Sequence, residues 1–321
     1  MRAFLPFLVI GVTTGAVYAL AAMGLVVTYT TSGVFNFAHG AVGMLATYLF
    51  YSMRVDAGWP TPLALAVALG VVAPLIGVLL DRVLLTRLAG ATTATYVVVS
   101  LGLLVALQGG VVAVYGAETR RLEALFPTST FRLFDVNVGY DQAIVVGIAV
   151  ASGLALAWFF SRTHLGLKTR AVVGDPELTE MVGSDSRAIT TASWVLGTVF
   201  AALSGILIAP VVGLDAVLLT LLVVQAFGAA IVGRLRSLPL TNLGAYGIAV
   251  LAALSTRYVA SNTSLIGLPT ALPFIVLFAV LIFSPKQAFV EVTERTDVRR
   301  LVDRPGERTR RGAGYVRLGA V

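Results

Sequence analysis

The chain has 321 residues, of which 58% are hydrophobic and only 12% are charged. A soluble domain carries charge on about a quarter of its residues, so this composition excludes an ordinary soluble enzyme and predicts an integral membrane protein. The absence of cysteine excludes disulfides, thiolate zinc sites and iron–sulfur clusters, and the net charge of +7 arises from basic residues in loops and in the tail, the pattern of membrane topology rather than of nucleic-acid binding.

Long apolar stretches without strict alternation predict an all-α fold, a polytopic transmembrane bundle of about eight or nine segments. The first stretch follows Arg2 and resembles a signal peptide, but it continues to about Val27 and is expected to be retained as a span. The expected segments are 4–28, 35–53, 62–86, 92–114, 141–161, 189–211, 216–233, 241–260 and 267–284.

The second segment opens with a polar cluster inside apolar sequence. It contains Asn36, Phe37, His39 and Gly40, and His39 is one of only two histidines in the chain. Polar groups at membrane depth are costly, so these four residues are candidates for the transport pathway or for a broken helix beside it. The alternative is that Asn36 and His39 only satisfy backbone groups of a loop or helix cap. Because Gly40 and Gly43 interrupt the segment, we expect a broken or buried helix that does not simply span the membrane.

A polar connector, residues 162–187, separates the fifth and sixth segments. Its basic residues place it in the cytoplasm by the positive-inside rule. Its second half predicts a short amphipathic helix that begins at Asp175 and ends near Gly183. The apolar face of this helix lies either against the bundle or the lipid interface, or against a soluble partner that docks on it.

The charge pattern also predicts two regions and an orientation. Residues 1–284 form the transmembrane domain, and residues 285–321 form a basic cytoplasmic tail whose composition favours disorder. The loop 115–140 and the N-terminus are then expected outside.

Few ionisable residues lie within the predicted spans. A secondary transporter driven by protons or sodium would have to use His39, Asp81 or Asp215, although Asp215 also fits a simple turn residue. A scaffold without transport activity is a further alternative. No nucleophile–base pair or metal-ligand cluster stands out, so we expect neither enzyme activity, nor a metal, nor a cofactor.

Two motifs together resemble a known family. The cluster from Asn36 to Gly40 follows a first span of the form Gly-x-x-x-Gly-x-x-Tyr-Ala-Leu, residues 11–20, and is similar to the permease subunits of branched-chain amino acid ABC importers, specifically the LivH branch. The similarity extends in order and spacing over most of residues 5–284. The connector carries the family's spaced glycines and basic residues at Gly166, Arg170, Ala171, Gly183 and Arg187.

The resemblance implies a type II ABC importer-like permease in the bacterial plasma (inner) membrane, with a cytoplasmic C-terminus. It would form half of a pathway for branched-chain or other small amino acids, or for urea or a small amide. The implied partners are two ATP-binding subunits, a second, LivM-like permease and an extracytoplasmic substrate-binding protein. ATP hydrolysis would occur in the partners, because this chain lacks a Gly-x-x-x-x-Gly-Lys-[Ser/Thr] phosphate loop. Gly166–Gly183 would be the coupling segment, with Arg170 and Glu177 contacting the ATPase.

One stretch departs from the family pattern. The family has a glycine-rich run after Gly233, whereas this chain has Arg234, Arg236 and Leu240 in place of three of those glycines. A tight turn is expected to be harder to form without them. The resemblance then implies either a remodelled turn, with both arginines at the cytoplasmic surface or a partner, or a divergent paralogue with another substrate or reduced activity.

Overall fold

The computed structural model describes residues 4–88, 90–133, 136–163, 166, 169, 186–259 and 267–283. The chain divides into a unit of residues 1–281 and a second of residues 282–321, and the contacts given below lie within the first. Much of the predicted connector and all of the predicted tail fall outside the described residues.

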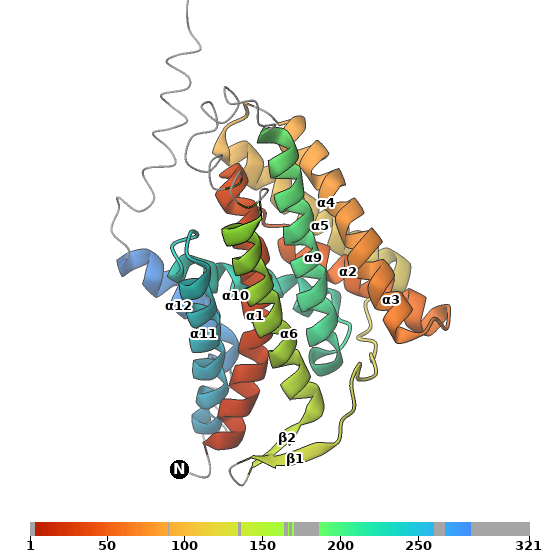
Figure 1. Cartoon of the computed structure of the whole chain (residues 1–321), viewed down its shortest axis with the longest axis vertical. Helices are drawn as coiled ribbons and strands as arrows, with labels where there is room; N and C mark the ends of the chain where they lie inside the picture. Colours follow the sequence, from red (N-terminus) through yellow and green to blue (C-terminus); the bar gives the residue numbers. More distant parts are fainter. Residues whose placement is uncertain are drawn as a thin grey trace, which may run out of the picture. The chain divides into compact units, whose positions relative to one another are not determined.

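The described elements are helices apart from one small hairpin, which confirms the all-α prediction (Figure 1). Strands β1 (Thr130–Leu133) and β2 (Val136–Gly139) pair antiparallel. Three π-helical stretches, Ser52–Asp56, Ala68–Val72 and Asp81–Thr86, continue or interrupt the α-helices. The α-helices are α1 (Leu5–Ser32), α2 (His39–Tyr51), α3 (Thr61–Val67), α4 (Ala73–Leu80), α5 (Thr93–Tyr115), α6 (Tyr140–Arg162), α9 (Ser186–Val212), α10 (Ala216–Val232), α11 (Leu238–Val259) and α12 (Leu268–Phe283).

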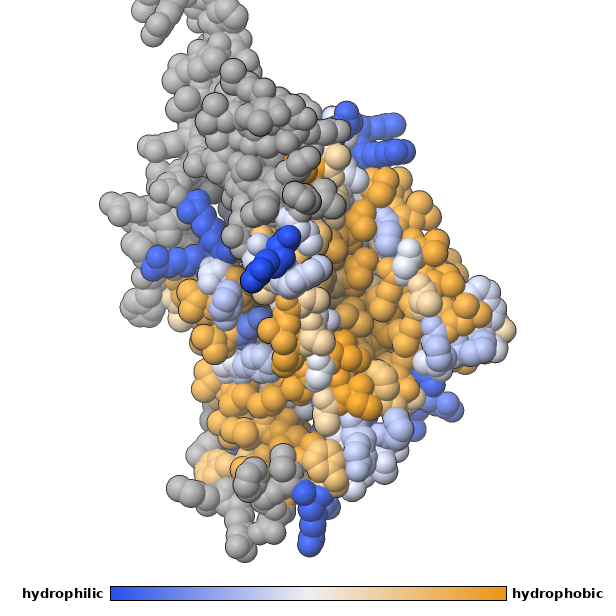
Figure 2. Space-filling model, viewed as in Figure 1, coloured by the Kyte–Doolittle hydropathy of each residue, from blue (hydrophilic) through white to orange (hydrophobic). Residues whose placement is uncertain are grey.

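Each predicted apolar segment contains described helix, and six stretches of the described residues are long and apolar enough to cross a bilayer. These six are α1, the continuous stretch Thr61–Thr86, α5, α6, α9 and α11. Helix α10 is apolar but shorter. Helix α2 has 13 residues, about 20 Å, before the π-helical stretch Ser52–Asp56 continues it, and it is not among the six. Figure 2 shows hydrophobic residues over most of one face, with strongly hydrophilic residues mainly near its margins.

Side-chain contacts define the two ends of the helical unit. At what we call the connector end, Arg187 at the start of α9 donates a hydrogen bond to Thr86 Oγ1 (2.8 Å). At the opposite, hairpin end, the Tyr48 hydroxyl near the end of α2 donates to the Leu214 carbonyl (3.1 Å). Followed along the chain, α1, the stretch Thr61–Thr86, α6 and α10 therefore run toward the connector end, whereas α2, α5, α9 and α11 run away from it.

The two halves of the chain repeat one plan in opposite directions. Each half begins with a long helix (α1 or α9), continues with a short one (α2 or α10) and adds two further helical stretches, while α6 lies between the halves. The packing follows the same plan, because α1 packs on α9, α10 and α11, and α9 packs on α1, α2 and α4. This inverted plan, which is common among transporters, is not evident by eye in the sequence.

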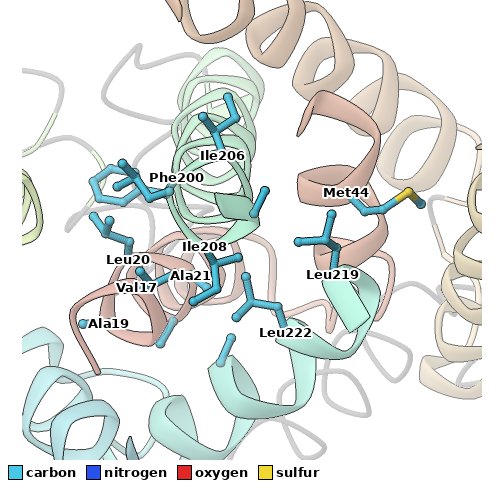
Figure 3. Close-up of a cluster of buried hydrophobic side chains, with 14 of the residues drawn as sticks. Val17, Ala19, Leu20, Ala21, Met44, Phe200, Ile206, Ile208, Leu219 and Leu222 are labelled. Carbon is cyan, nitrogen blue, oxygen red and sulfur yellow. The ribbon is translucent and has the colours of Figure 1, made fainter. Parts of the chain in front are cut away.

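Helices α1, α2, α9 and α10 meet in the core, where their hydrophobic side chains pack together (Figure 3). Glycine allows the close approach of α1 and α9: a Cβ at Gly24 would lie 2.8 Å from the carbonyl oxygen of Gly197. In lipid the hydrophobic effect does not draw helices together, so this close backbone contact supplies the dispersion energy that holds them.

Candidate functional site: a re-entrant loop and half-helix

Helix α1 ends at the connector end, and the chain then turns back into the protein. Gly33 ends the helix in a left-handed conformation (φ 66°), and its N–H donates to the Tyr29 carbonyl (2.8 Å). Glycine suits this position because it has no Cβ to clash there. The next helix begins only at His39, so a short non-helical segment re-enters the helical unit.

Asn36 organises this segment through its own backbone. Its Oδ1 accepts the N–H of Ala38 (3.0 Å), and its carbonyl accepts the N–H of His39 (3.2 Å). The side chain is only 2% exposed. This Asx-type turn satisfies buried N–H groups and starts α2.

His39 fixes the depth at which α2 begins. Its ring is 2% exposed, and Nε2 lies 3.0 Å from the carbonyl oxygen of Ala21 on α1. A carbonyl oxygen only accepts, so Nε2 carries the proton. Ala21 precedes the last helical residue, Ser32, by 11 positions, which places His39 about 16 Å from the connector end. That is roughly the middle of a bilayer, so α2 is a half-helix that runs from mid-depth to the hairpin end.

Gly40 lets the start of α2 lie directly against α10. A Cβ at this position would clash with the Thr220 carbonyl oxygen and would lie 3.0 Å from Val223 Cβ. The two short helices therefore pack backbone to backbone at the centre of the unit.

Phe37 belongs to an aromatic cluster on the connector side of this contact. Its ring centroid lies 5.0 Å from that of Phe227 on α10, and the Phe35 centroid lies 5.8 Å from Phe227 and 4.5 Å from Tyr29. Sequence reasoning missed Phe227. A signal existed, because the short helices share an Ala-x-Gly-Ala pattern, residues 38–41 and 226–229.

The structure brings together all four residues of the predicted cluster. Asn36 and His39 hydrogen-bond to backbone groups, Gly40 packs closely on α10 and Phe37 contacts Phe227 on the connector side. The described residues hold no group of metal-ligating side chains. The polar cluster thus supports irregular backbone at membrane depth, which proteins tolerate only where it is buried or lines a cavity.

The acidic candidates for ion coupling are also hydrogen-bonded. Asp215 caps α10, because its Oδ1 accepts the N–H groups of Val217 (2.8 Å) and Leu218 (2.9 Å). Asp81 is 4% exposed, and its Oδ2 accepts the Thr191 hydroxyl of α9 (2.6 Å). Asp215 therefore has the role of a helix-capping turn residue.

The connector is described only at its two ends. Gly166 donates its N–H to Thr163 Oγ1 (3.0 Å) and packs against the end of α6. Arg187 bonds Thr86, next to the contact between Asp81 and Thr191. These two pairs join the first turns of α9 to the end of the stretch Thr61–Thr86. The other predicted coupling residues lie outside the described residues: Arg170, Ala171, Glu177 and Gly183.

The turn that departs from the family pattern forms nevertheless. Arg234 (φ 51°) and Leu235 (φ 56°) both adopt left-handed conformations without being glycine. The Leu235 N–H donates to the Ala230 carbonyl (2.8 Å), and its side chain is 5% exposed. Hydrogen bonding and burial thus offset the strain of this conformation.

Comparison with known proteins identifies the family. The model of the family described as "Branched-chain amino acid transport system / permease component" matches residues 7–285. The chain belongs to this family. It is 26% identical over 271 residues to the high-affinity branched-chain amino acid transport system permease protein LivH of Escherichia coli K12, covering 81% of this chain and 88% of the relative.

Two further relatives of this permease family show similar identity. The permease protein BraD of Pseudomonas aeruginosa is 28% identical over 253 residues, or 75% of this chain and 82% of the relative. The probable LivH permease of Methanocaldococcus jannaschii is 27% identical over 282 residues, or 83% and 86%. The resemblance found in the sequence is confirmed, and the chain is a multi-pass membrane permease.

Proposed function

We propose that this permease is one subunit of an ATP-driven importer and forms half of the pathway for a branched-chain or other small, mostly apolar amino acid. The observation that carries the proposal is the family match over residues 7–285, together with relatives named for branched-chain amino acid transport. The half-helix at mid-depth adds support, because broken helices accompany substrate paths in many transporters.

The proposed partners are the subunits that an importer needs in addition to this permease. Two ATP-binding subunits, a second permease and an extracytoplasmic binding protein would complete the transporter, and hydrolysis would occur in the ATP-binding subunits. The ATPases would dock on the connector, with Arg170 and Glu177 as contacts. The connector end would then face the cytoplasm together with the C-terminus.

The contacts at the connector end suggest how motion would be transmitted. Arg187 bonds Thr86, and Thr191 bonds the buried Asp81. A push on the connector would therefore move α9 and the stretch Thr61–Thr86 as one body. Such rigid-body rocking of packed helices is a common form of alternating access.

The test is uptake of radiolabelled leucine by vesicles that contain the purified complex. We expect uptake with enclosed ATP and none with a proton or sodium gradient alone. Arg170→Glu should abolish ATPase co-purification, whereas Arg162→Glu, an exposed arginine at the end of α6, should preserve it. Gradient-driven uptake without ATP would contradict the proposal. Uptake of urea or a small amide in place of leucine would overturn only the proposed substrate and not the ATP-driven mechanism.

A further inference from the structure

Helix α10 belongs to the core, yet one of its faces is exposed along the first half of the helix. The residues on this face recur every three or four positions and are Val217, Leu218, Leu221, Val224 and Gln225. The first two are about half exposed. Leu219 and Leu222 lie on the other side of the helix, among the buried side chains of the core (Figure 3). Helix α10 therefore presents a mostly apolar face to whatever lies beside this chain.

The exposed face ends near the middle of the membrane. Gln225 follows Asp215, the N-cap of α10 at the hairpin end, by 10 positions, or about 15 Å of helix. Half of a hydrocarbon core is about that thick. One turn further along, a Cβ at Gly228 would lie 3.3 Å from Ile248 Cδ1 and 3.5 Å from the Pro273 carbonyl oxygen. Helices α11 and α12 therefore cover α10 beyond Gln225, and the face runs only from the hairpin end to mid-depth.

Gln225 is the one polar residue among the five on this face. Its side chain is partly exposed, but its Oε1 is buried and has no hydrogen-bond partner in the described part of the chain. Buried polar groups without a partner are rare in native structures, and each calls for a physical reason such as a bound water, an ion or a functional role. Because the oxygen is the buried half of the amide, the NH2 group is the half that can reach the open face.

The order of residues along the face matches a zwitterionic amino acid better than it matches lipid. The aliphatic residues near the hairpin end suit an apolar side chain and would suit lipid tails equally well. The amide at mid-depth would not suit lipid, because hydrocarbon offers it neither a donor nor an acceptor. An NH2 group donates to a carboxylate, and hydrogen bonds to charged groups are stronger than those between neutral groups. Mid-depth is also where transporters hold their substrates.

We propose that this face of α10 lines the transport pathway and that Gln225 determines specificity there. Its NH2 group donates to the carboxylate of the amino acid, while Leu218 and Leu221 contact the apolar side chain. The inference rests on the proposed function and deepens it, since urea and simple amides have no carboxylate for Gln225 to bind.

Because the chain has no cysteine, single cysteines can test for a water-filled path without measuring transport. In permeabilised vesicles that hold the complex, a charged methanethiosulfonate reagent should label Leu218→Cys and Leu221→Cys, because thiols react as thiolates, which form in water. Val105→Cys is the matched control, since Val105 is 66% exposed in the middle of the apolar helix α5 and would face lipid. Labelling on α10 no faster than at this control would overturn the proposal and leave the importer function untouched.

ATP-driven uptake of leucine tests the amide itself. The readout is the maximal rate, because the binding protein would set the apparent KM. Gln225→Met should lower this rate about tenfold, a usual loss for one hydrogen bond to a charged group. Its melting temperature should not fall, because the Oε1 that it removes has no partner in the described chain. Asn242→Leu is the control: Asn242 Oδ1 is also buried without a partner, but Asn242 lies on α11 and lines a different cavity, so uptake should be retained.

A second substitution tests which end of the amino acid Gln225 binds. Gln225→Glu, assayed at alkaline pH, presents acceptors alone and should lower the rate at least as much as Gln225→Met. Full uptake by either variant, or an equal loss in Asn242→Leu, would overturn the proposal. Wild-type uptake in the same vesicles reports the importer function separately, so the failure of one does not imply the failure of the other.

Discussion

Gly40 allows the close contact between the short helices α2 and α10, because any side chain there would meet the α10 backbone. The clash would be with the Thr220 carbonyl, which α10 holds rigidly and which cannot rotate away as a flexible side chain would. The polar residues beside it depend on this packing. If α2 moved away from α10, the bond from His39 to the α1 carbonyl would lengthen or break.

Substitution of Gly40 by alanine should therefore destabilise the protein by about 1–3 kcal/mol, the usual cost of overpacking a tight core. The measurement is the apparent melting temperature of the detergent-purified chain, with leucine uptake by the complex as a second readout. Gly102→Ala is the control, because a Cβ there meets nothing within 4 Å and Gly102 also lies in an apolar helix. A melting temperature for Gly40→Ala equal to that of the control would contradict this prediction and show that α10 can shift to accommodate the added methyl group.

At Arg234 the backbone conformation predicts the opposite effect, because here a change to glycine should stabilise the protein. A non-glycine residue in the left-handed region lowers the free energy of unfolding by about 1–2 kcal/mol. Glycine avoids this cost, but the greater conformational entropy that it gives the unfolded chain lowers the free energy of unfolding by about 0.4–1 kcal/mol. Arg234→Gly should therefore stabilise the protein slightly, by up to about 1 kcal/mol, seen as a higher melting temperature. Arg234→Ala retains the Cβ and should give no such gain. Equal gains from both variants would point to removal of the charge as the cause.

At the scale of elements, composition and spacing were sufficient to predict the helices. Every apolar segment contains helix, because a bundle in lipid must satisfy its backbone within each segment. A broken or buried helix was also expected in the second segment, from Gly40 and Gly43, but α2 runs unbroken through both glycines and the break lies before it, at residues 33–38. The depth of the break was not predicted, since it depends on a bond between His39 and Ala21, which lie on different helices. The π-helical stretches and the inverted plan left no clear pattern in a single sequence.

The same limit applies to the site. Asn36, Phe37, His39 and Gly40 were singled out from residue type alone, and the structure gathers them at one place. Their partners on α10, Thr220 and Phe227, were missed because packing between distant segments is not encoded in local spacing.

The cap of α10 gives a prediction that separates two kinds of transporter. Asp215→Asn keeps an oxygen that can accept the N–H groups of Val217 and Leu218, and asparagine caps helices about as well as aspartate. Stability and leucine uptake should therefore both be retained. Asp215→Ala removes the cap and should cost about 1 kcal/mol, measured as a lower melting temperature. Normal folding but abolished uptake in Asp215→Asn would instead revive an ion-coupled mechanism.

At the scale of the whole molecule, the direction of every described span follows once one end is assigned to one side of the membrane. In the proposed orientation, the basic residues of the connector place the connector end in the cytoplasm. The loop after α5 would then face outside, although it contains Arg120 and Arg121. Arg120 is engaged within the protein: its guanidinium donates to the Tyr115 carbonyl (2.7 Å) and lies 5.8 Å from the centre of the Tyr51 ring. Its charge is thus partly used in packing, which weakens its effect as a topology signal.

Because the chain has no cysteine, single cysteines can report this orientation without background. Glu118 is exposed at the hairpin end, just before the strand-like contact of Arg120 with Leu214, and Arg87 is exposed at the connector end, just after the stretch Thr61–Thr86. In right-side-out vesicles a membrane-impermeant maleimide should label Glu118→Cys at once and Arg87→Cys only after the membrane is permeabilised. The reverse pattern would place the connector outside, where no cytoplasmic ATPase could reach it, and the coupling role of the contacts between α9 and Thr61–Thr86 would fail with it.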